Sequence, residues 1–230
     1  MANSPTKLSP LHAALTKHNV QHSEHRGWAV TEAYSPLEHE LYAARTRVAI
    51  ADTTPNGKLM IEGAQAHAVV RNTLDVPDIP VGMGIILSGS GIYRLRDDQF
   101  FISTPPGEES ALQDKLTQAA AQSGAFVTTT DLTHGKSELR LIGPNSPDLL
   151  SKVCALDFHP REFPDAAARQ TSVAKTTQLI IRRDIDTIAA FTLIGSRSLG
   201  EYLWDVVLEA GHELDLRPIG QKALTALRDA

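Results

Sequence analysis

Three glycine-containing segments approach the spacing that phosphate binding requires, and none completes it. Gly135-Lys136-Ser137 matches the end of a phosphate-binding loop, but the first glycine of such a loop would stand at position 130, which is Thr130. Gly82-Met83-Gly84 and Gly89-Ser90-Gly91 begin like a dinucleotide fingerprint and lack its third glycine. Backbone amides surround a pyrophosphate only where the full spacing places them at a helix N-terminus. We therefore interpret the two paired-glycine segments as turns.

Histidines near the N-terminus are the next candidates for chemistry. His12, His18, His22 and His25 gather around Glu24. Only His18 and His22 have the helical i, i+4 spacing of a zinc site, and the residues between them suggest the end of a helix. We expect solvated polar side chains here and predict no metal site.

The single cysteine also has a structural interpretation. As the sole cysteine, Cys154 cannot form an internal disulfide, and its place in the apolar run 153–156 is typical of a buried thiol. A nucleophilic thiol needs an activating partner, and His159 is the one candidate nearby. No serine stands in a Gly-x-Ser-x-Gly elbow, so no hydrolase is indicated.

Composition narrows the classes of function. The 230 residues are 21% charged and 42% apolar, with a net charge of −5 and a pI near 6.0. Such a chain has no basic stripe to displace counterions, and 5% aromatic residues offer few stacking surfaces. The N-terminus shows no secretory signal, and no apolar run reaches the roughly 18 to 20 residues that span a bilayer. We expect a soluble, cytoplasmic protein that binds neither nucleic acid nor membrane.

The elements that must position any site begin with two helices. Ser9-Pro10 precedes an apolar stripe at helical spacing. A second helix is predicted from Ser35 to Arg47, with Ser35 as its cap, Pro36 in its first turn and Glu38 as the capping-box carboxylate.

The rest of the chain repeats itself. A short strand passes through a glycine into a helix at residues 58–72 and again at 138–154, and the two glycines, Gly63 and Gly143, are 80 positions apart. Each unit continues with a proline-bearing loop, a strand and a helix that ends at a glycine. The loops are residues 76–80 and 159–164, the strands 99–103 and 190–194, and the final glycines Gly124 and Gly211.

This order of elements predicts an α+β fold. Strand, helix, strands and helix in each half is the order of a β-α-β-β-α-β sandwich. We predict two packed, duplicated subdomains at residues 51–130 and 131–230, preceded by an N-terminal helical segment at 1–50. Chance similarity between two α+β units is the alternative, since strand-glycine-helix is common.

Short motifs at both ends resemble the glycine-cleavage T-protein family, the tetrahydrofolate-dependent aminomethyltransferases. The C-terminal stretch is similar to the family segment that precedes a barrel domain, so the resemblance implies a T-protein-like fold without that barrel. The motifs are Gly27-Trp28-Ala29-Val30, Tyr34-Ser35, Glu38-His39-Glu40, residues 44–52, Asn56-Gly57-Lys58-Leu59, residues 203–211, Arg217-Pro218-Ile219-Gly220, Ala223 and Leu227-Arg228.

The middle of the chain resembles one branch of this family. Residues 154–164, followed by residues 168–174, are similar to the gamma subunit of heterotetrameric sarcosine oxidase. In that enzyme the larger subunits resemble flavin oxidases and folate-binding proteins. The resemblance therefore implies a hetero-oligomer with flavin- and folate-binding subunits.

Three positions depart from what the T-protein family uses for its chemistry. The hairpin that carries its catalytic aspartate is too short here, and Asp97-Asp98 looks like a turn instead. Residues 184–188 stand where the family has the glutamate that holds the pterin ring, and Leu224 stands where it has an arginine. A pterin needs buried, paired hydrogen-bonding groups, and each missing one costs about 1–3 kcal/mol. We expect no catalytic residues and no tightly bound cofactor, although tetrahydrofolate stays a candidate ligand.

One loop still matches the family segment that borders the folate cavity. Its candidate ligand residues are Asp52, Asn56, Gly57 and Lys58, and the resemblance adds Arg228 from the C-terminal motif. A purely structural interpretation competes, because Asn-Gly makes a tight turn and an aspartate can close one.

The sequence thus leads to a first hypothesis, a non-catalytic gamma-like subunit of a sarcosine- or N-methyl-amino-acid-oxidising complex. The alternative is a stand-alone tetrahydrofolate-dependent aminomethyltransferase-like protein with an altered site. A third hypothesis is a folate-sensing or iron–sulfur-maintenance accessory protein of the same superfamily, but the chain lacks the lysine-glycine-cysteine-tyrosine motif that those proteins carry.

Overall fold

The computed structural model describes residues 6–16 and 20–229, which divide into two compact units. Unit 1 comprises the chain up to Thr54, Lys136–Asp165 and the part from Gln170 onward, and unit 2 comprises Pro55–Gly135 with Ala166–Arg169. The described residues up to Thr54 therefore belong to the same unit as most of the second half of the chain. The predicted division at 1–50, 51–130 and 131–230 stays a prediction.

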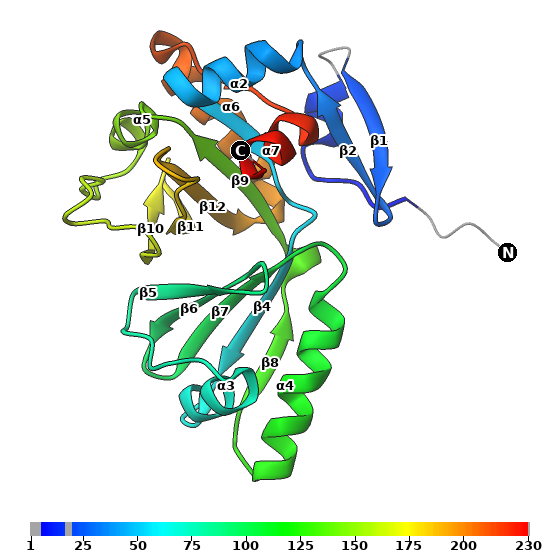
Figure 1. Cartoon of the computed structure of the whole chain (residues 1–230), viewed down its shortest axis with the longest axis vertical. Coiled ribbons are helices and arrows are strands. Elements are labelled where there is room, and N and C mark those ends of the chain that lie inside the picture. Colours follow the sequence, from blue (N-terminus) through cyan, green and yellow to red (C-terminus); the bar gives the residue numbers. More distant parts are fainter. Residues whose placement is uncertain (1–5, 17–19, 230) are drawn as a thin grey trace, which may run out of the picture. The chain divides into compact units, whose positions relative to one another are not determined.

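Unit 2 is a five-stranded antiparallel sheet with two helices on one face (Figure 1). The strand order is β5-β6-β7-β4-β8. Alternate strand residues such as Leu59, Ile61 and Ile102 form one buried cluster with Val70 and Leu116 of the helices, as the period of two in a strand requires. The elements are β4 (Gly57–Glu62), α3 (Ala66–Leu74), β5 (Met83–Leu87), β6 (Ser90–Arg96), β7 (Gln99–Thr104), α4 (Glu109–Ser123) and β8 (Thr128–Asp131).

Unit 1 has a six-stranded sheet in the order β10-β11-β12-β9-β3-β13. One apolar cluster on this sheet joins Ala49 and Ile142 to Ala223, Leu224 and Leu227 of α7. The elements are β3 (Ala49–Asp52), β9 (Lys136–Ile142), α5 (Ser146–Val153), β10 (Ala168–Val173), β11 (Thr176–Arg182), β12 (Ala190–Ser196), α6 (Gly200–Gly211), β13 (Arg217–Pro218) and α7 (Gln221–Arg228), with short 3₁₀ turns at 133–135, 197–199 and 212–214.

The sequence predicted a helical N-terminal segment, but the N-terminal part of unit 1 also contains two strands. An antiparallel hairpin stands between its two helices, and Arg26 and Gly27 at its tip take φ values of 50° and 81°. The predicted helices exist, but the first has only four residues. The elements are α1 (His12–Leu15), β1 (Gln21–His25), β2 (Trp28–Ala33) and α2 (Leu37–Thr46).

The start of α2 differs from the predicted capping box. Pro36 is the N-cap residue, and no side-chain cap is formed by Ser35. Glu40, two positions after the predicted Glu38, accepts hydrogen bonds from the backbone N–H groups of Tyr34 (2.6 Å), Ser35 (2.9 Å) and Gly220 (2.9 Å). The buried carboxylate of Glu40 thus links the start of α2 to the start of α7 through charge-assisted hydrogen bonds, whereas Glu38 is exposed.

The duplication is visible in the strand orders. β10-β11-β12-β9-β3 in unit 1 corresponds to β5-β6-β7-β4-β8 in unit 2. Gly63 and Gly143 take φ values of 142° and 136°, and a Cβ at either would lie 2.3 and 2.4 Å from the carbonyl oxygens of Phe126 and Arg47. Only glycine allows this close approach of a strand end to a neighbouring backbone. The predicted repeat therefore has the same local cause in both halves.

The predicted α+β class is confirmed. Of the helices in the described part of the chain, none has the length and apolar character needed to span a bilayer. His18 and the first five residues lie outside the described residues. Among those described, no three His, Cys, Asp or Glu side chains gather closely enough to hold a metal ion.

Candidate functional site

Asp52 ends β3 and closes a turn in unit 1. Its Oδ1 atom accepts a hydrogen bond from the N–H of Thr54 (3.0 Å). The hydroxyl oxygen of Thr54 in turn accepts the N–H of Glu138 (3.1 Å), and the Thr53 hydroxyl donates to Oε1 of Glu138 (2.8 Å). The structural interpretation of Asp52 as a turn-closing residue is thus confirmed, and the turn fixes the buried carboxyl group of Glu138.

Tyr34 is a neighbour of Asp52 that the sequence did not single out. Burial raises the pKa of the Tyr34 phenol, and the negative charges of Asp52 and Glu40 raise it further, while a contact with Thr31 acts in the opposite direction. A phenol that stays protonated can act as a hydrogen-bond donor. Asp52 therefore lies in an environment with one neutral phenol and a second carboxylate.

Arg228, the last residue of α7, belongs to a charged group of unit 1. Loss of hydration lowers the pKa of its guanidinium, the positive charge of Arg183 lowers it further, and Glu138 acts in the opposite direction. The residue as a whole is exposed, and an arginine stays protonated at neutral pH even when its pKa is lowered in this way. Arg140 adjoins the same group, since its Nη2 donates to the backbone oxygen of Arg183 (3.1 Å).

Asn56, Gly57 and Lys58 belong to unit 2, at the start of β4. Lys58 is fully buried, and its Nζ donates to the backbone oxygen of Asn56 (2.7 Å). A Cβ on Gly57 would lie 2.2 Å from Oγ1 of Thr104 and 2.8 Å from Oε2 of Glu109, so the glycine is required by packing. The predicted ligand residues are thus divided between the units, with Asp52 and Arg228 in unit 1 and these three in unit 2.

A second copy of the Asp52 turn stands in unit 2, and the sequence analysis missed it. Oδ1 of Asp131 accepts the N–H of Thr133 (2.8 Å), and the Thr133 hydroxyl accepts the N–H of Lys58 (3.0 Å). Lys58 and Glu138 therefore hold corresponding places, each fixed by an Asp-x-Thr turn. The signal was present in the sequence, because Asp131-Leu132-Thr133 follows Asp52-Thr53-Thr54 by 79 positions.

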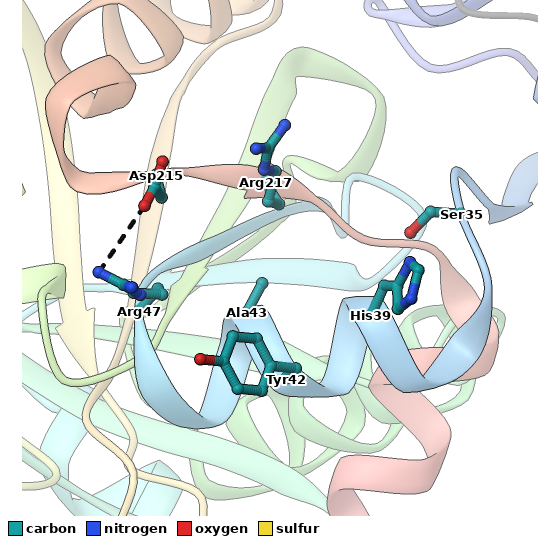
Figure 2. Close-up of a pocket in the computed structure, with 7 residues that line it drawn as sticks. All are labelled: Ser35, His39, Tyr42, Ala43, Arg47, Asp215 and Arg217. Atoms are coloured by element: carbon teal, nitrogen blue, oxygen red, sulfur yellow. Dashed lines mark ion pairs between the residues drawn. The ribbon is translucent and has the colours of Figure 1, made fainter.

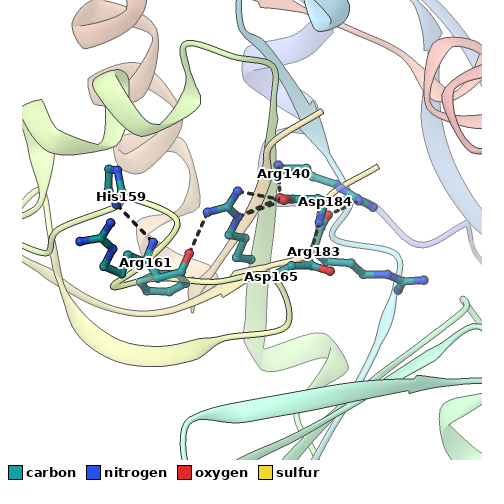
Figure 3. A network of polar contacts seen from close by, with 9 residues as sticks. Arg140, His159, Arg161, Asp165, Arg183 and Asp184 are labelled. Atoms are coloured by element: carbon teal, nitrogen blue, oxygen red, sulfur yellow. Dashed lines mark hydrogen bonds and ion pairs between the residues drawn. The ribbon is translucent and has the colours of Figure 1, made fainter. Parts of the chain in front are cut away.

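Asp184, one of the positions predicted to depart from the family pattern, is fully engaged within the chain (Figure 3). Arg182 donates from Nε and Nη2 to its carboxylate at 2.9 to 3.2 Å, and the N–H of Ala190 adds a third donor at 3.1 Å. Nη1 of Arg182 reaches the backbone oxygen of Phe163 (2.8 Å), and Asp165 accepts the N–H of Asp184 (2.9 Å). These bonds tie the loop that resembles the gamma subunit to the β11–β12 hairpin.

The same loop is anchored by aromatic packing. Phe158 and Phe163 are buried against Phe191, with ring centroids 5.6 and 6.0 Å from it, and Arg182 lies 5.5 Å above the Phe191 ring. His159 between them is exposed, and its Nδ1 accepts the N–H of Arg161 (3.2 Å). The segment is therefore a rigid part of unit 1. Cys154 just before it is buried, as predicted for a structural thiol.

The other two positions in question are also structural. Leu224 is buried in the apolar cluster on the unit 1 sheet, so it leaves no space for a guanidinium. Asp97 and Asp98 form the turn between β6 and β7, as predicted, and each is exposed and pairs with an arginine, Arg94 at 3.2 Å and Arg96 at 3.3 Å. A folate site that used these positions does not fit the residues present.

A shallow groove in unit 1 was not anticipated by the sequence (Figure 2). It has a volume of about 410 Å³ and lies between α2 and the segment around β13. Arg47 and Asp215 meet across it at 3.7 Å, and both are about half exposed. Such a pair contributes little to stability, and Arg217 leaves the lining with one positive charge that Asp215 does not balance. None of the predicted ligand residues lines it; the lining residues are Ser35, His39, Tyr42, Ala43, Arg47, Asp215 and Arg217.

These features define a duplicated α+β protein whose two halves repeat one strand order and one turn. Residues 11–229 match the GCVT N-terminal domain, and the chain belongs to that family.

Its relatives include an aminomethyltransferase of Alkaliphilus metalliredigens (strain QYMF), 25% identical over 99% of this chain and 64% of that protein. Sarcosine oxidase subunit gamma of Corynebacterium sp. (strain U-96) is 33% identical over 58% of this chain and 64% of the relative. The chain thus spans less than two thirds of the length of these relatives. The predicted resemblance to the T-protein superfamily, close to the gamma subunit, is confirmed.

Two solved structures share the fold. Aminomethyltransferase T of the Bartonella henselae glycine cleavage system superimposes with a TM-score of 0.81 at 18% identity, covering 96% of this chain and 62% of that one. A chain of the heterotetrameric sarcosine oxidase from Corynebacterium sp. U-96 superimposes with a TM-score of 0.66 at 24% identity, covering 90% of this chain and 95% of that one.

Proposed function

We propose that this chain is a non-catalytic, accessory subunit of a folate-linked complex that oxidises sarcosine or another N-methyl amino acid. The observation that carries the proposal is the engagement of Asp184. Its carboxylate already accepts three donors from Arg182 and Ala190, so using it to hold a pterin would break a largely buried ion pair. Leaving the partner charge unpaired costs about 3–5 kcal/mol, more than one hydrogen bond to a ligand returns.

The relatives support the subunit role. Sarcosine oxidase subunit gamma is itself one chain of an assembly, and the heterotetrameric enzyme contains a chain with this fold. We propose that flavin- and folate-binding subunits are the partners of this chain as well. The chain would then contribute a folded surface to the assembly and leave oxidation and one-carbon transfer to the larger subunits.

A second candidate function is supported by the charged groups that remain. Glu138 and Lys58 are buried, and Arg228 lies close enough to Glu138 to interact electrostatically. A carboxylate and guanidinium are the groups with which a protein can recognise a pterin or a glutamate tail. The alternative is therefore a stand-alone aminomethyltransferase-like protein that binds tetrahydrofolate with Asp52, Asn56, Gly57, Lys58 and Arg228.

Calorimetric titration of the isolated chain with tetrahydrofolate and its formyl derivative separates the two candidates. We expect no saturable heat in the micromolar range. Saturable binding that weakens in Asp52→Ala and Lys58→Ala would establish the alternative instead. Asp98→Ala is the control, because it removes an exposed turn carboxylate of unit 2 that is not among the predicted ligand residues.

Co-expression tests the subunit role directly. We expect the chain to elute with flavin-containing and folate-binding chains of an N-methyl-amino-acid-oxidising complex, in one peak that carries flavin absorbance. The isolated chain should carry none. An isolated monomer with aminomethyltransferase or oxidase activity would overturn the proposal.

A further inference from the structure

The groove between α2 and the segment around β13 has an excess of positive charge (Figure 2). Two of its lining side chains, Arg47 and Arg217, are guanidinium groups, and Asp215 is the one carboxylate among the described lining residues. Asp215 pairs with Arg47 at 3.7 Å, and no carboxylate of the described residues pairs with Arg217. One positive charge is therefore left unbalanced in the groove, although the chain as a whole has a net charge of −5.

The register of two strands explains why Arg217 has no acidic partner. β13 pairs in parallel with β3, and this pairing places Arg217 opposite Ala49. The N–H of Arg217 donates to the backbone oxygen of Val48 (3.2 Å), which fixes the register. Two positions earlier, the same register places Asp215 opposite Arg47, where the ion pair forms. The residue that faces Arg217 is thus a buried alanine, which cannot neutralise its charge.

The α2 side of the groove supplies hydrogen-bond donors and an aromatic ring. The hydroxyl groups of Ser35 and Tyr42 and the imidazole of His39 can each donate a hydrogen bond. The Tyr42 residue is 61% exposed, so much of its ring is open to solvent, and its neighbour in the lining, Ala43, is small. This side of the groove therefore offers a flat apolar surface together with polar groups that suit an acceptor.

We propose that the groove binds a small organic monocarboxylate that has a planar, apolar body. A guanidinium such as that of Arg217 can hold a carboxylate through two parallel hydrogen bonds, and one unbalanced positive charge matches a monoanion better than a phosphate dianion. The planar body of the ligand lies on the open ring of Tyr42. The groove volume of about 410 Å³ falls within the roughly 300–1,000 Å³ of small-molecule sites.

This binding site goes beyond the proposed function. It uses residues of unit 1 alone and requires neither a folate nor a larger subunit. None of the residues predicted to hold a folate lines it, so Asp52→Ala and Lys58→Ala should leave its affinity unchanged. A failure of this proposal is therefore distinguishable from a failure of the subunit role.

NMR titration of the full chain with benzoate, at constant ionic strength, is the test. We expect saturable shifts of the Nε–H signal of Arg217 and of the α2 amides, with a dissociation constant on the order of 1 mM, because the charges are open to solvent. Acetate carries the charge without the ring and should bind about tenfold more weakly. Benzamide has the shape of benzoate without its charge and should give no saturable shift.

Variants of the lining residues separate the contributions of charge and ring. Arg217→Gln should weaken benzoate binding about tenfold or more, and Tyr42→Ala should remove the preference for benzoate over acetate. Asp215→Asn should strengthen binding about threefold, because it removes the carboxylate that competes for Arg47. Asparagine also tolerates the left-handed backbone of this position, where φ is 54°.

Arg45→Gln is the matched control for Arg217→Gln. Arg45 is an exposed arginine of α2 that does not line the groove, so the variant changes the net charge equally. It should bind benzoate as the unaltered chain does, and the amide spectrum of each variant shows that it is folded. Absence of a saturable shift with benzoate, equal binding of benzamide, or equal losses in Arg45→Gln and Arg217→Gln would overturn the proposal.

Discussion

The two units contain the same arrangement of an arginine, a phenylalanine and an aspartate, but the arginine–aspartate pair is more buried in unit 1 than in unit 2. In unit 1, Arg182 of β11 stacks on Phe191 of β12 at 5.5 Å. In unit 2, Arg94 of β6 stacks on Phe100 of β7 at 5.9 Å. Each arginine also donates to a carbonyl oxygen of the proline-bearing loop, and each pairs with an aspartate of the following hairpin.

The difference lies in the solvent around these pairs. The side chains of Arg182 and Asp184 are 8% and 19% exposed, whereas those of Arg94 and Asp97 are 14% and 91% exposed. Removing one partner of a buried ion pair leaves the other charge without compensation. Water can solvate the remaining charge of an exposed pair. The comparison teaches that the β11–β12 hairpin is tied into the framework of unit 1 by a buried ion pair, whereas the β6–β7 turn of unit 2 is held by an exposed one.

The largest effect should come from breaking the buried pair. Arg182→Ala leaves Asp184 without its partner and is expected to lower the free energy of unfolding by about 3–5 kcal/mol. Arg94→Ala removes the corresponding side chain from unit 2 and should cost only about 1–2 kcal/mol. Urea unfolding of both variants measures the difference. Equal costs would mean that burial does not distinguish the two halves.

The two strand-end glycines should come next. Gly63→Ala and Gly143→Ala each place a Cβ against a carbonyl oxygen at a φ that side chains rarely adopt, at an expected cost on the order of 3 kcal/mol. Gly124→Ala is the control, since Gly124 has a φ of 66° with open space around it and should cost only about 1 kcal/mol. Chemical denaturation of the three variants checks the order. A loss of only about 1 kcal/mol at either Gly63 or Gly143 would show that the two glycines do not play the same structural role.

The two Asp-x-Thr turns, at residues 52–54 and 131–133, should each contribute a smaller and similar amount to the free energy of unfolding. Thr54→Val and Thr133→Val remove the hydroxyl oxygens that accept the N–H groups of Glu138 and Lys58, and each should cost about 1–3 kcal/mol. Hydrogen exchange should show faster exchange at the amide of Glu138 in the first variant and of Lys58 in the second. Protection that is unchanged at both amides would show that the turns do not fix these residues.

Tyr34 should give the smallest effect at neutral pH. Because its pKa is raised in the folded protein, Tyr34 contributes stability that is fully present below the ordinary tyrosine pKa of about 10 and lost as the pH rises above it. Tyr34→Phe should unfold like the original chain at neutral pH and lose less stability above about pH 10. Parallel pH curves for the two proteins would contradict this.

Much of the fold followed from the sequence because it depends on local signals. Glycine positions 63 and 143 marked the repeat, and the hairpin at Asp97-Asp98 was predicted from its turn residues. The β1–β2 hairpin was missed because its strands, QHSEH and WAVTEA, show no strict apolar alternation.

The site was less predictable, because its partners are distant in the chain. Glu40 meets Gly220 across 180 positions, and Thr53 meets Glu138 across 85. The engagement of Asp184 by Arg182 spans only two positions, yet an Arg-x-Asp pattern does not reveal whether the pair is buried. The role of Asp52, Asn56, Gly57, Lys58 and Arg228 toward a ligand stays a prediction.

The place of β3 in its sheet has a consequence for biosynthesis. β3 ends at Asp52, but its neighbours β9 and β13 are translated only after the whole contiguous stretch of unit 2 from Pro55 to Gly135. Unit 2 therefore has nearly all its residues outside the ribosome while unit 1 is still an incomplete sheet with an open edge. A nascent chain of this protein must keep one edge of β3 unpaired until β9 has emerged, and the other edge until β13 has emerged.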